Sequence, residues 1–144
     1  MNNSTYQYNY FNDINLPIIV NQDTINETPY SFQSDGTMWE NNSIYNFFKL
    51  ISPNDDLNII DIGAQTGLYS LYAKYLPKCK FYSFEPFITT YNILNQNLIL
   101  NYINNVNTYN TAISDKIGKR GLSSFPMNLK IRYKMCRNNE KMFK

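Results

Sequence analysis

Apolar and polar positions in the central part of the chain repeat with two different periods, and these periods predict alternating strands and helices. Short apolar runs at residues 57–61, 80–85 and 106–109 have the length and composition of buried strands. Between them, apolar side chains recur every three or four residues at 67–76 and 89–102, as on one face of a helix. Alternation through short connections favours right-handed crossovers, so we predict an α/β fold with a parallel sheet of three strands and flanking helices.

Helix boundaries are suggested by individual residues. A further helix is predicted at 43–51, where Ser43 is a suitable N-cap and Pro53 a stop signal. Pro77 ends the helix at 67–76, and Thr89 or Thr90 can cap the helix at 89–102.

The two ends of the chain differ in pattern from its centre. Residues 1–42 are polar and rich in Asn and Tyr, with one apolar island at 16–20, so we expect an irregular arm that can hold one short strand. From 129 to 135, apolar and basic side chains alternate strictly, as in a strand with one exposed face. We therefore divide the chain into an N-terminal arm at 1–42, a ligand-binding half domain at 43–118 and a basic extension at 119–144, which holds a short strand or hairpin.

Charge is distributed unevenly along the chain. Residues 1–114 contain four basic and nine acidic side chains, whereas residues 115–144 contain nine basic and two acidic ones, which together give the net charge of +2. A basic tail is compatible with nucleic-acid binding and also with an edge strand protected by lysines. We favour the edge strand, because the alternation at 129–135 accounts for much of the charge.

Composition excludes several kinds of chemistry. The chain contains no histidine, which removes the commonest general base and metal ligand, and its two cysteines are too far apart for a zinc cluster. We expect no metal site. No run approaches the roughly 18 apolar residues of a membrane span, and the first residues do not resemble a secretion signal. We expect a cytoplasmic protein.

Two carboxylates and a glycine loop lie at the ends of the first two predicted strands. Asp61 ends the run at 57–61, Glu85 ends the run at 80–85, and the loop after Asp61 contains Gly63 and Gly67. Parallel sheets bind ligands where loops leave the carboxyl ends of their strands, and glycine allows close approach of the backbone. In nucleotide-binding folds an acid at the position of Glu85 accepts hydrogen bonds from ribose hydroxyls. The alternative is structural: the glycines serve a tight turn, Asp61 is an N-cap and Glu85 faces solvent.

The loop matches neither of two common nucleotide motifs. The dinucleotide fingerprint fails because Gln65 stands where its second glycine is required, and a P-loop fails because Gly67 is followed by Leu68. An acid at the strand end suits a ligand with an α-amino acid head. S-adenosylmethionine combines such a head with ribose and adenine.

Three segments in order, IIDIGAQTGLYSLYAKYL, FYSFEPFITTYNILNQNLILN and NVNTYNTAISDKIG, resemble the cofactor half of the FkbM-like methyltransferases. These belong to the class I S-adenosylmethionine-dependent group, so the resemblance implies a partial Rossmann-like sheet over about residues 58–118. It also implies O-methyl transfer to a hydroxyl of a sugar or small molecule. The residues that it assigns to the cofactor are Asp61, Gly63, Ala64 and Gly67 around the methionine portion, Glu85 at the ribose hydroxyls, Pro86 and Phe87 beside the adenine, and Asn110 to Ala112 at the adenine edge.

Two classes of function stay open, because class I methyltransferases have seven strands and the 29 residues after Asp115 hold at most one more strand–helix unit. In the first, the protein is an active methyltransferase completed by self-association or by a partner chain. Its base would then be an Asp, Glu, Lys or Tyr, with Asp115 as the candidate. In the second, it is a truncated, inactive S-adenosylmethionine-binding remnant or an interaction module.

Overall fold

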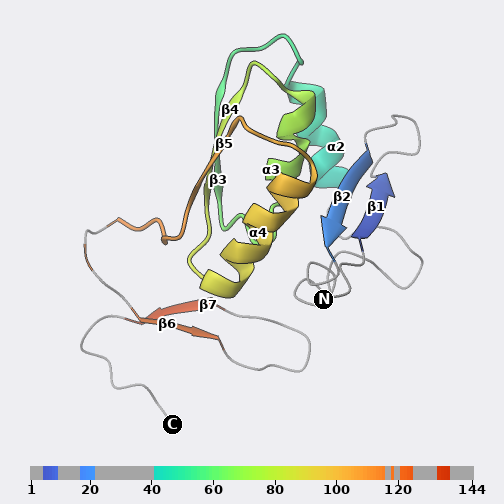
Figure 1. Cartoon of the computed structure of the whole chain (residues 1–144). Coiled ribbons are helices and arrows are strands. Elements are labelled where there is room, and N and C mark those ends of the chain that lie inside the picture. The colour runs from blue at the N-terminus through green and yellow to red at the C-terminus, as the bar shows by residue number, and fades with distance from the viewer. Residues whose placement is uncertain are drawn as a thin grey trace. The chain divides into compact units, whose positions relative to one another are not determined.

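The computed structural model describes residues 5–9, 17–21, 41–115, 118, 121–124 and 133–136 (Figure 1). The chain forms two compact units, Met1–Ala112 and Ile113–Lys144, and each is described by itself. The three-part division at residues 42 and 118 stays a prediction. The first unit contains β1 (Thr5–Asn9), β2 (Pro17–Asn21), α2 (Asn41–Leu50), β3 (Asn58–Ile62), α3 (Leu68–Leu71), the 3₁₀-helix η1 (Tyr72–Tyr75), β4 (Lys80–Phe84), α4 (Ile88–Leu100) and β5 (Val106–Tyr109).

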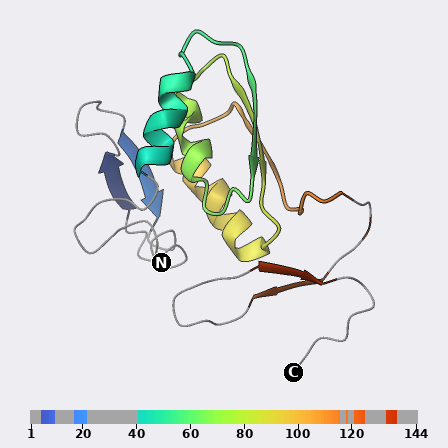
Figure 2. The same ribbon diagram turned by 180° about the vertical axis from the view of Figure 1, so that it is seen from behind.

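The centre of the first unit is a parallel sheet with the strand order β3-β4-β5, which confirms the predicted α/β fold. Helices α2, α3 and α4 lie on one side of this sheet in both opposite views (Figures 1 and 2). Across the sheet, Ile59 pairs with Phe81, which in turn pairs with Val106. Because side chains alternate between the two faces of a strand, this apolar row and the row two residues later face the helices.

The row two residues later is polar. Asp61, Ser83 and Thr108 lie side by side in the register of β3, β4 and β5. Ser83 is fully buried, while Asp61 and Thr108 are half-buried. On the face that packs against the helices, the first of these two rows is therefore apolar. The second row, one residue before the strands end, is polar.

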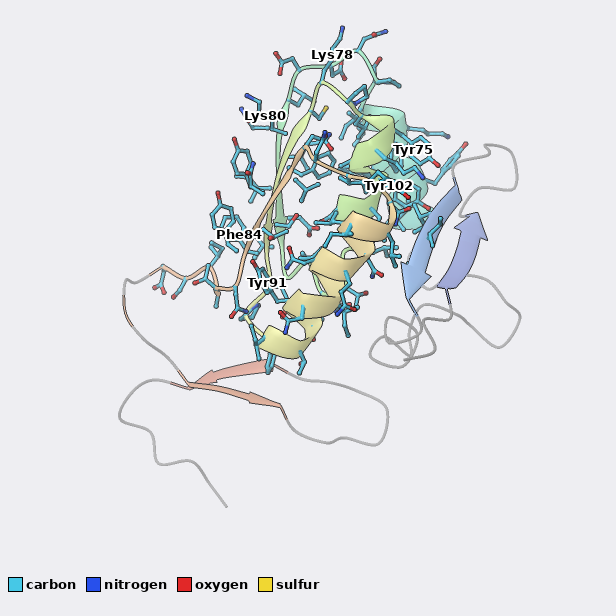
Figure 3. The ribbon with its side chains drawn as sticks, viewed as in Figure 1. Tyr75, Lys78, Lys80, Phe84, Tyr91 and Tyr102 are labelled. Carbon is cyan, nitrogen blue, oxygen red and sulfur yellow. The ribbon has the colours of Figure 1, made fainter. Side chains whose placement is uncertain are left out.

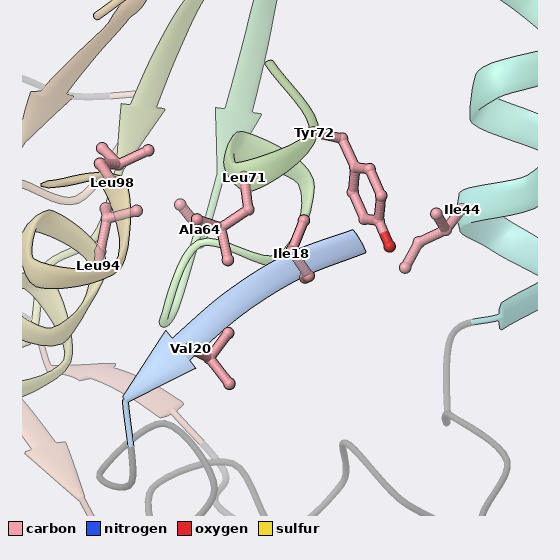
Figure 4. Close-up of a cluster of buried hydrophobic side chains, with 8 residues drawn as sticks. All are labelled: Ile18, Val20, Ile44, Ala64, Leu71, Tyr72, Leu94 and Leu98. Atoms are coloured by element: carbon pink, nitrogen blue, oxygen red, sulfur yellow. The ribbon is translucent and has the colours of Figure 1, made fainter. Parts of the chain in front are cut away.

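The described residues of the N-terminal arm before α2 form two strands, where the composition suggested one. β2 confirms the short strand expected near residues 16–20, but it also pairs with β1 in an antiparallel hairpin that the sequence did not predict. Ile18 and Val20 of β2 are buried in the main hydrophobic cluster (Figure 4), which also contains Ile44, Ala64, Leu71, Tyr72, Leu94 and Leu98.

The side chain of Asn101 attaches this hairpin to the end of α4. Its Oδ1 accepts a hydrogen bond from the backbone N–H of Ile19 at 2.9 Å, and its Nδ2 donates to the carbonyl oxygen of Ile19 at 2.6 Å. Asn101 is itself buried, so both bonds are partly shielded from water. The hairpin thus belongs to the same packed unit as the parallel sheet.

Three helix boundaries differ from those predicted. α2 begins at Asn41, so Ser43 lies inside the helix and is not its N-cap. α4 begins after Phe87, and neither Thr89 nor Thr90 caps it. The helix predicted at 67–76 starts as α-helix and tightens to η1 after Leu71, where Leu76 donates its N–H to Ala73 in a bond that spans three residues.

The second face of the parallel sheet carries exposed apolar side chains. Ile60 and Ile62 of β3 are 66% and 63% exposed, and Tyr109 of β5 is also exposed. Phe84 lies on this side of the sheet, away from α4 (Figure 3). Parallel sheets are usually covered on both faces, whereas among the described residues of this unit only one face carries helices.

The second unit contains an antiparallel pair, β6 (Gly121–Ser124) and β7 (Tyr133–Cys136). β7 overlaps the end of the strand predicted at 129–135, and the earlier residues of that prediction lie outside the described ranges. No helix in the described parts of the chain has the length and apolarity needed to cross a membrane.

We predict that Asn105→Ala destabilises the first unit by about 1–3 kcal/mol, because it removes hydrogen bonds from partly buried carbonyl groups. The Nδ2 of Asn105 donates to the carbonyl oxygens of Ala73, Leu76 and Cys79 at 3.0–3.1 Å and so holds the turn between η1 and β4. Urea unfolding of both variants tests this, with the exposed neighbour Asn104→Ala as a matched control that changes stability by less than about 0.5 kcal/mol. Equal effects of the two substitutions would contradict the role of Asn105.

Candidate ligand-binding site at the ends of the parallel strands

Backbone hydrogen bonds connect the loop after β3 to the end of β4. The N–H groups of Gly63 and Ala64 both donate to the carbonyl oxygen of Phe84, at 2.9 and 3.1 Å. Asp61 also lies beside Ser83 in the sheet register. The structure therefore brings together the glycine loop and the strand end that carries Glu85, as the sequence predicted from the parallel arrangement.

The loop contains three residues with left-handed backbone conformations. Their φ angles are +79° at Gly63, +50° at Gln65 and +96° at Gly67. A Cβ atom at Gly63 would meet no heavy atom within 4 Å, whereas a Cβ atom at Gly67 would lie 2.5 Å from Cδ1 of Leu94. A Cβ atom at Gly67 would therefore have to displace the Leu94 side chain of α4, while the space beside Gly63 is open to a ligand.

A buried asparagine holds the same loop from the helix side. Nδ2 of Asn97 donates to the carbonyl oxygen of Thr66 at 2.9 Å, and Asn97 is fully buried on α4. The sequence pattern alone did not identify this residue as part of the site. The available signal was a polar side chain three residues after Leu94, on the face of the helix that the periodicity assigns to the core.

Glu85 is buried, and both of its carboxylate oxygens accept backbone hydrogen bonds. Its side chain is only 2% exposed; Oε2 accepts from the N–H of Gln65 at 3.0 Å, and Oε1 accepts from the N–H of Phe87 at 2.8 Å. The alternative of a solvent-facing strand end is therefore wrong. The carboxylate orders the loop after β3 and the start of α4, where Phe87 is the N-cap residue.

Burial also changes the acidity of Glu85. Loss of hydration raises the pKa of this carboxyl above its ordinary value of 4.5, and the hydrogen bonds from Phe87 and Gln65 oppose that rise. The pKa is raised overall because desolvation is the larger effect.

Asp61 is held by a hydroxyl group from the following helix. Oγ of Ser70 donates to Oδ2 of Asp61 at 3.0 Å and lies 2.7 Å from Oγ of Ser83, with both serines fully buried. Asp61 itself is half-buried in β3. Its position inside a strand excludes the alternative that it caps the following helix, because that helix begins after Gly67.

β5 and the residue that follows it contact the segment at the end of β4. The N–H of Glu85 donates to the carbonyl oxygen of Tyr109 at 3.0 Å. Nδ2 of Asn110 donates to the carbonyl oxygens of Glu85 and Pro86, at 2.9 and 3.1 Å. The structure thus places Asn110 against the segment of Glu85, Pro86 and Phe87, and Ala112 follows two residues later, half-buried.

Asp115 belongs to the second unit and is exposed. Its Oδ1 accepts a hydrogen bond from Oγ of Ser114 at 3.2 Å. The assignment of Asp115 as a catalytic base stays a prediction. In the described part of the chain, no group of three or more His, Cys, Asp or Glu side chains is arranged to hold a metal ion.

Comparison with known proteins supports a methyltransferase relationship. Over 70 residues, the chain is 39% identical to the methyltransferase sdnD of Sordaria araneosa. The match covers 47% of this chain and 27% of that protein, so the chain corresponds to only a part of its relative. No family model and no solved structure matches the chain.

We predict that Gly67→Ala destabilises the protein more than Gly63→Ala. Both substitutions impose a left-handed conformation on an L-residue, at a cost of about 1–2 kcal/mol each. Gly67→Ala also forces its Cβ atom against the buried Leu94, which adds about 1–3 kcal/mol. Urea unfolding at one pH measures the difference, and an equal loss in both variants would show that Leu94 does not restrict this position.

We predict that Glu85 makes stability depend on pH in a defined direction. Because its pKa is raised in the folded state, the folded protein binds this proton more tightly than the unfolded chain. The contribution of Glu85 to the free energy of unfolding should therefore fall as the pH rises from 4.5 to the raised pKa. Thermal unfolding across this interval measures the contribution as the free energy of unfolding of the wild type minus that of Glu85→Gln. If the wild type instead became more stable relative to Glu85→Gln as the pH rises, the pKa of Glu85 would not be raised in the folded protein.

Proposed function

We propose that the protein is an FkbM-like methyltransferase that uses S-adenosylmethionine and methylates a hydroxyl group of a sugar or a small molecule. The observation that carries this proposal is the pair of acids, Asp61 and Glu85, at the ends of two adjacent parallel strands. Between them lies the glycine loop, in which three residues have left-handed backbone conformations. The 70-residue similarity to a methyltransferase supports the same type of reaction.

The residues of the site fit the parts of S-adenosylmethionine, whose sulfonium supplies the methyl group when it is bound. Asp61 offers a carboxylate to the amino group of the methionine portion, and the open space beside Gly63 lets that portion approach the backbone. Ala64 and Gly67 complete the loop. Ionised carboxylates form the stronger, charge-assisted hydrogen bonds with an ammonium group, which favours Asp61 for this role.

Glu85 is proposed to bind the ribose hydroxyls in addition to ordering the loops. A carboxylate has about four lone-pair sites, and the N–H groups of Gln65 and Phe87 use two of them. Pro86 and Phe87 follow Glu85 and are proposed to lie beside the adenine ring. The segment from Asn110 to Ala112 is proposed for the adenine edge, since Asn110 already contacts the carbonyl groups of Glu85 and Pro86.

Turnover requires a base and a shielded site. In a chain without histidine, removal of the proton from an acceptor hydroxyl falls to a residue such as Asp115. Completion of the sheet by self-association or by a partner chain is part of the proposal. The exposed Ile60 and Ile62 lie on the second face of the sheet, so they support coverage of that face by another polypeptide in such an assembly.

Calorimetric titration with S-adenosylmethionine and with S-adenosylhomocysteine tests the proposal. We expect saturable binding by the wild type and at least about tenfold weaker binding by Glu85→Gln, which loses a charged acceptor. Asn104→Ala serves as the surface control and should bind as the wild type does. A folded wild type that binds neither compound would refute the proposed function.

Activity distinguishes the enzyme from the inactive binding module. Transfer of a labelled methyl group from S-adenosylmethionine to a panel of sugars and small alcohols would establish the enzyme. Cofactor binding without transfer to any acceptor, at protein concentrations that allow self-association, would favour the binding module.

A further inference from the structure

We infer that Ser70 and Ser83 are positioning residues that fix the carboxylate of Asp61 for the amino group of the cofactor. This inference rests on the proposed function and concerns a more specific point than the binding of the cofactor itself. The observation behind it is a continuous chain of hydrogen bonds from β4 through α3 to β3, which links Ser83, Ser70 and Asp61.

The direction of each hydrogen bond in this chain can be assigned. Ser70 has one hydroxyl proton and donates it to Oδ2 of Asp61 at 3.0 Å. Its contact of 2.7 Å with Ser83 must then use a proton from Ser83. Ser83 therefore donates to Ser70, and Ser70 donates to Asp61. A serine that receives a hydrogen bond becomes a better donor, so the two bonds strengthen each other.

Burial makes this arrangement rigid. Ser70 and Ser83 are both fully buried, so water does not compete for their hydroxyl groups. The first turn of α3 follows the loop after β3, and the N–H of Leu71 donates to the carbonyl oxygen of Gly67 at 2.8 Å. The hydroxyl of Ser70 therefore connects the position of the glycine loop to the orientation of Asp61. A carboxylate already oriented loses less conformational freedom when a ligand binds.

Thr108 provides an internal comparison within the same polar row. It lies beside Ser83 in the register of β5, but its hydroxyl group bonds to Asn95 at 2.8 Å and to Tyr91 at 3.2 Å. Removal of this hydroxyl also breaks hydrogen bonds between the sheet and α4, but it removes no hydrogen bond to Asp61. Thr108→Val is therefore a matched control for effects on stability alone.

Two ligands separate positioning of Asp61 from binding of the nucleoside. S-adenosylhomocysteine contains the amino acid portion, whereas 5′-methylthioadenosine has the same nucleoside without it. We expect Ser70→Ala to weaken binding of S-adenosylhomocysteine by about tenfold, the effect of one hydrogen bond to a charged group, and to leave 5′-methylthioadenosine unaffected. Thr108→Val should bind both compounds as the wild type does.

Two further variants keep the test decisive if Ser70→Ala does not fold. Ser83→Ala removes only the outer donor, so it should shift the ratio of the two affinities in the same direction by a smaller factor. Ser70→Thr retains the hydroxyl group and should restore the wild-type ratio. Thermal unfolding of each variant establishes that the measured protein is folded.

The outcomes separate this inference from the proposed function. If the wild type binds neither ligand, the proposed function fails and the inference fails with it. If the wild type binds both ligands and the serine variants keep the wild-type ratio of affinities, the function stands and the positioning role is overturned. An equal weakening for both ligands would also overturn it, because it would show a general structural effect.

Discussion

The buried carboxylate of Glu85 is the contact on which the arrangement of the candidate site depends. Its two oxygens hold the N–H groups of Gln65 and Phe87, and therefore fix the loop after β3 relative to the start of α4. The carbonyl oxygen of Phe84 adds two bonds to the same loop, and Asn110 holds the segment that follows Glu85. One strand end thus connects the loops of all three parallel strands.

This arrangement has an energetic cost and a chemical consequence. Burial raises the pKa of Glu85, and the backbone hydrogen bonds recover part of the lost hydration. Asp61 is supported differently, by the hydroxyl group of Ser70. The two acids therefore occupy neighbouring strand ends in distinct surroundings: one is tied to backbone amides and the other to a side-chain donor. This difference suits two polar groups of one ligand, an amine and a pair of hydroxyls.

Periodicity alone predicted the parallel sheet and the approximate bounds of its helices, because strands and helices with one buried face leave a clear pattern. The strand ends then identified Asp61, Glu85 and the glycine loop. The asparagines that hold the site loop, the hairpin and the turn before β4 were not predictable in this way: Asn97, Asn101 and Asn105 act through contacts that are distant in sequence. In a chain so rich in asparagine, the structural asparagines cannot be distinguished from the exposed ones by sequence. The β1–β2 hairpin was missed because β1 is polar, whereas the apolar β2 was expected as a short strand.

An amide chemical-shift titration of the isotope-labelled protein with S-adenosylhomocysteine tests most directly whether the ends of the parallel strands bind the cofactor. We expect saturable changes concentrated at residues 61–67, 85–87 and 110–112, with the N–H groups of Gln65 and Phe87 among the most affected because they contact Glu85. A folded protein whose spectrum does not change, or changes only outside these three segments, would show that the ends of the parallel strands do not bind the cofactor.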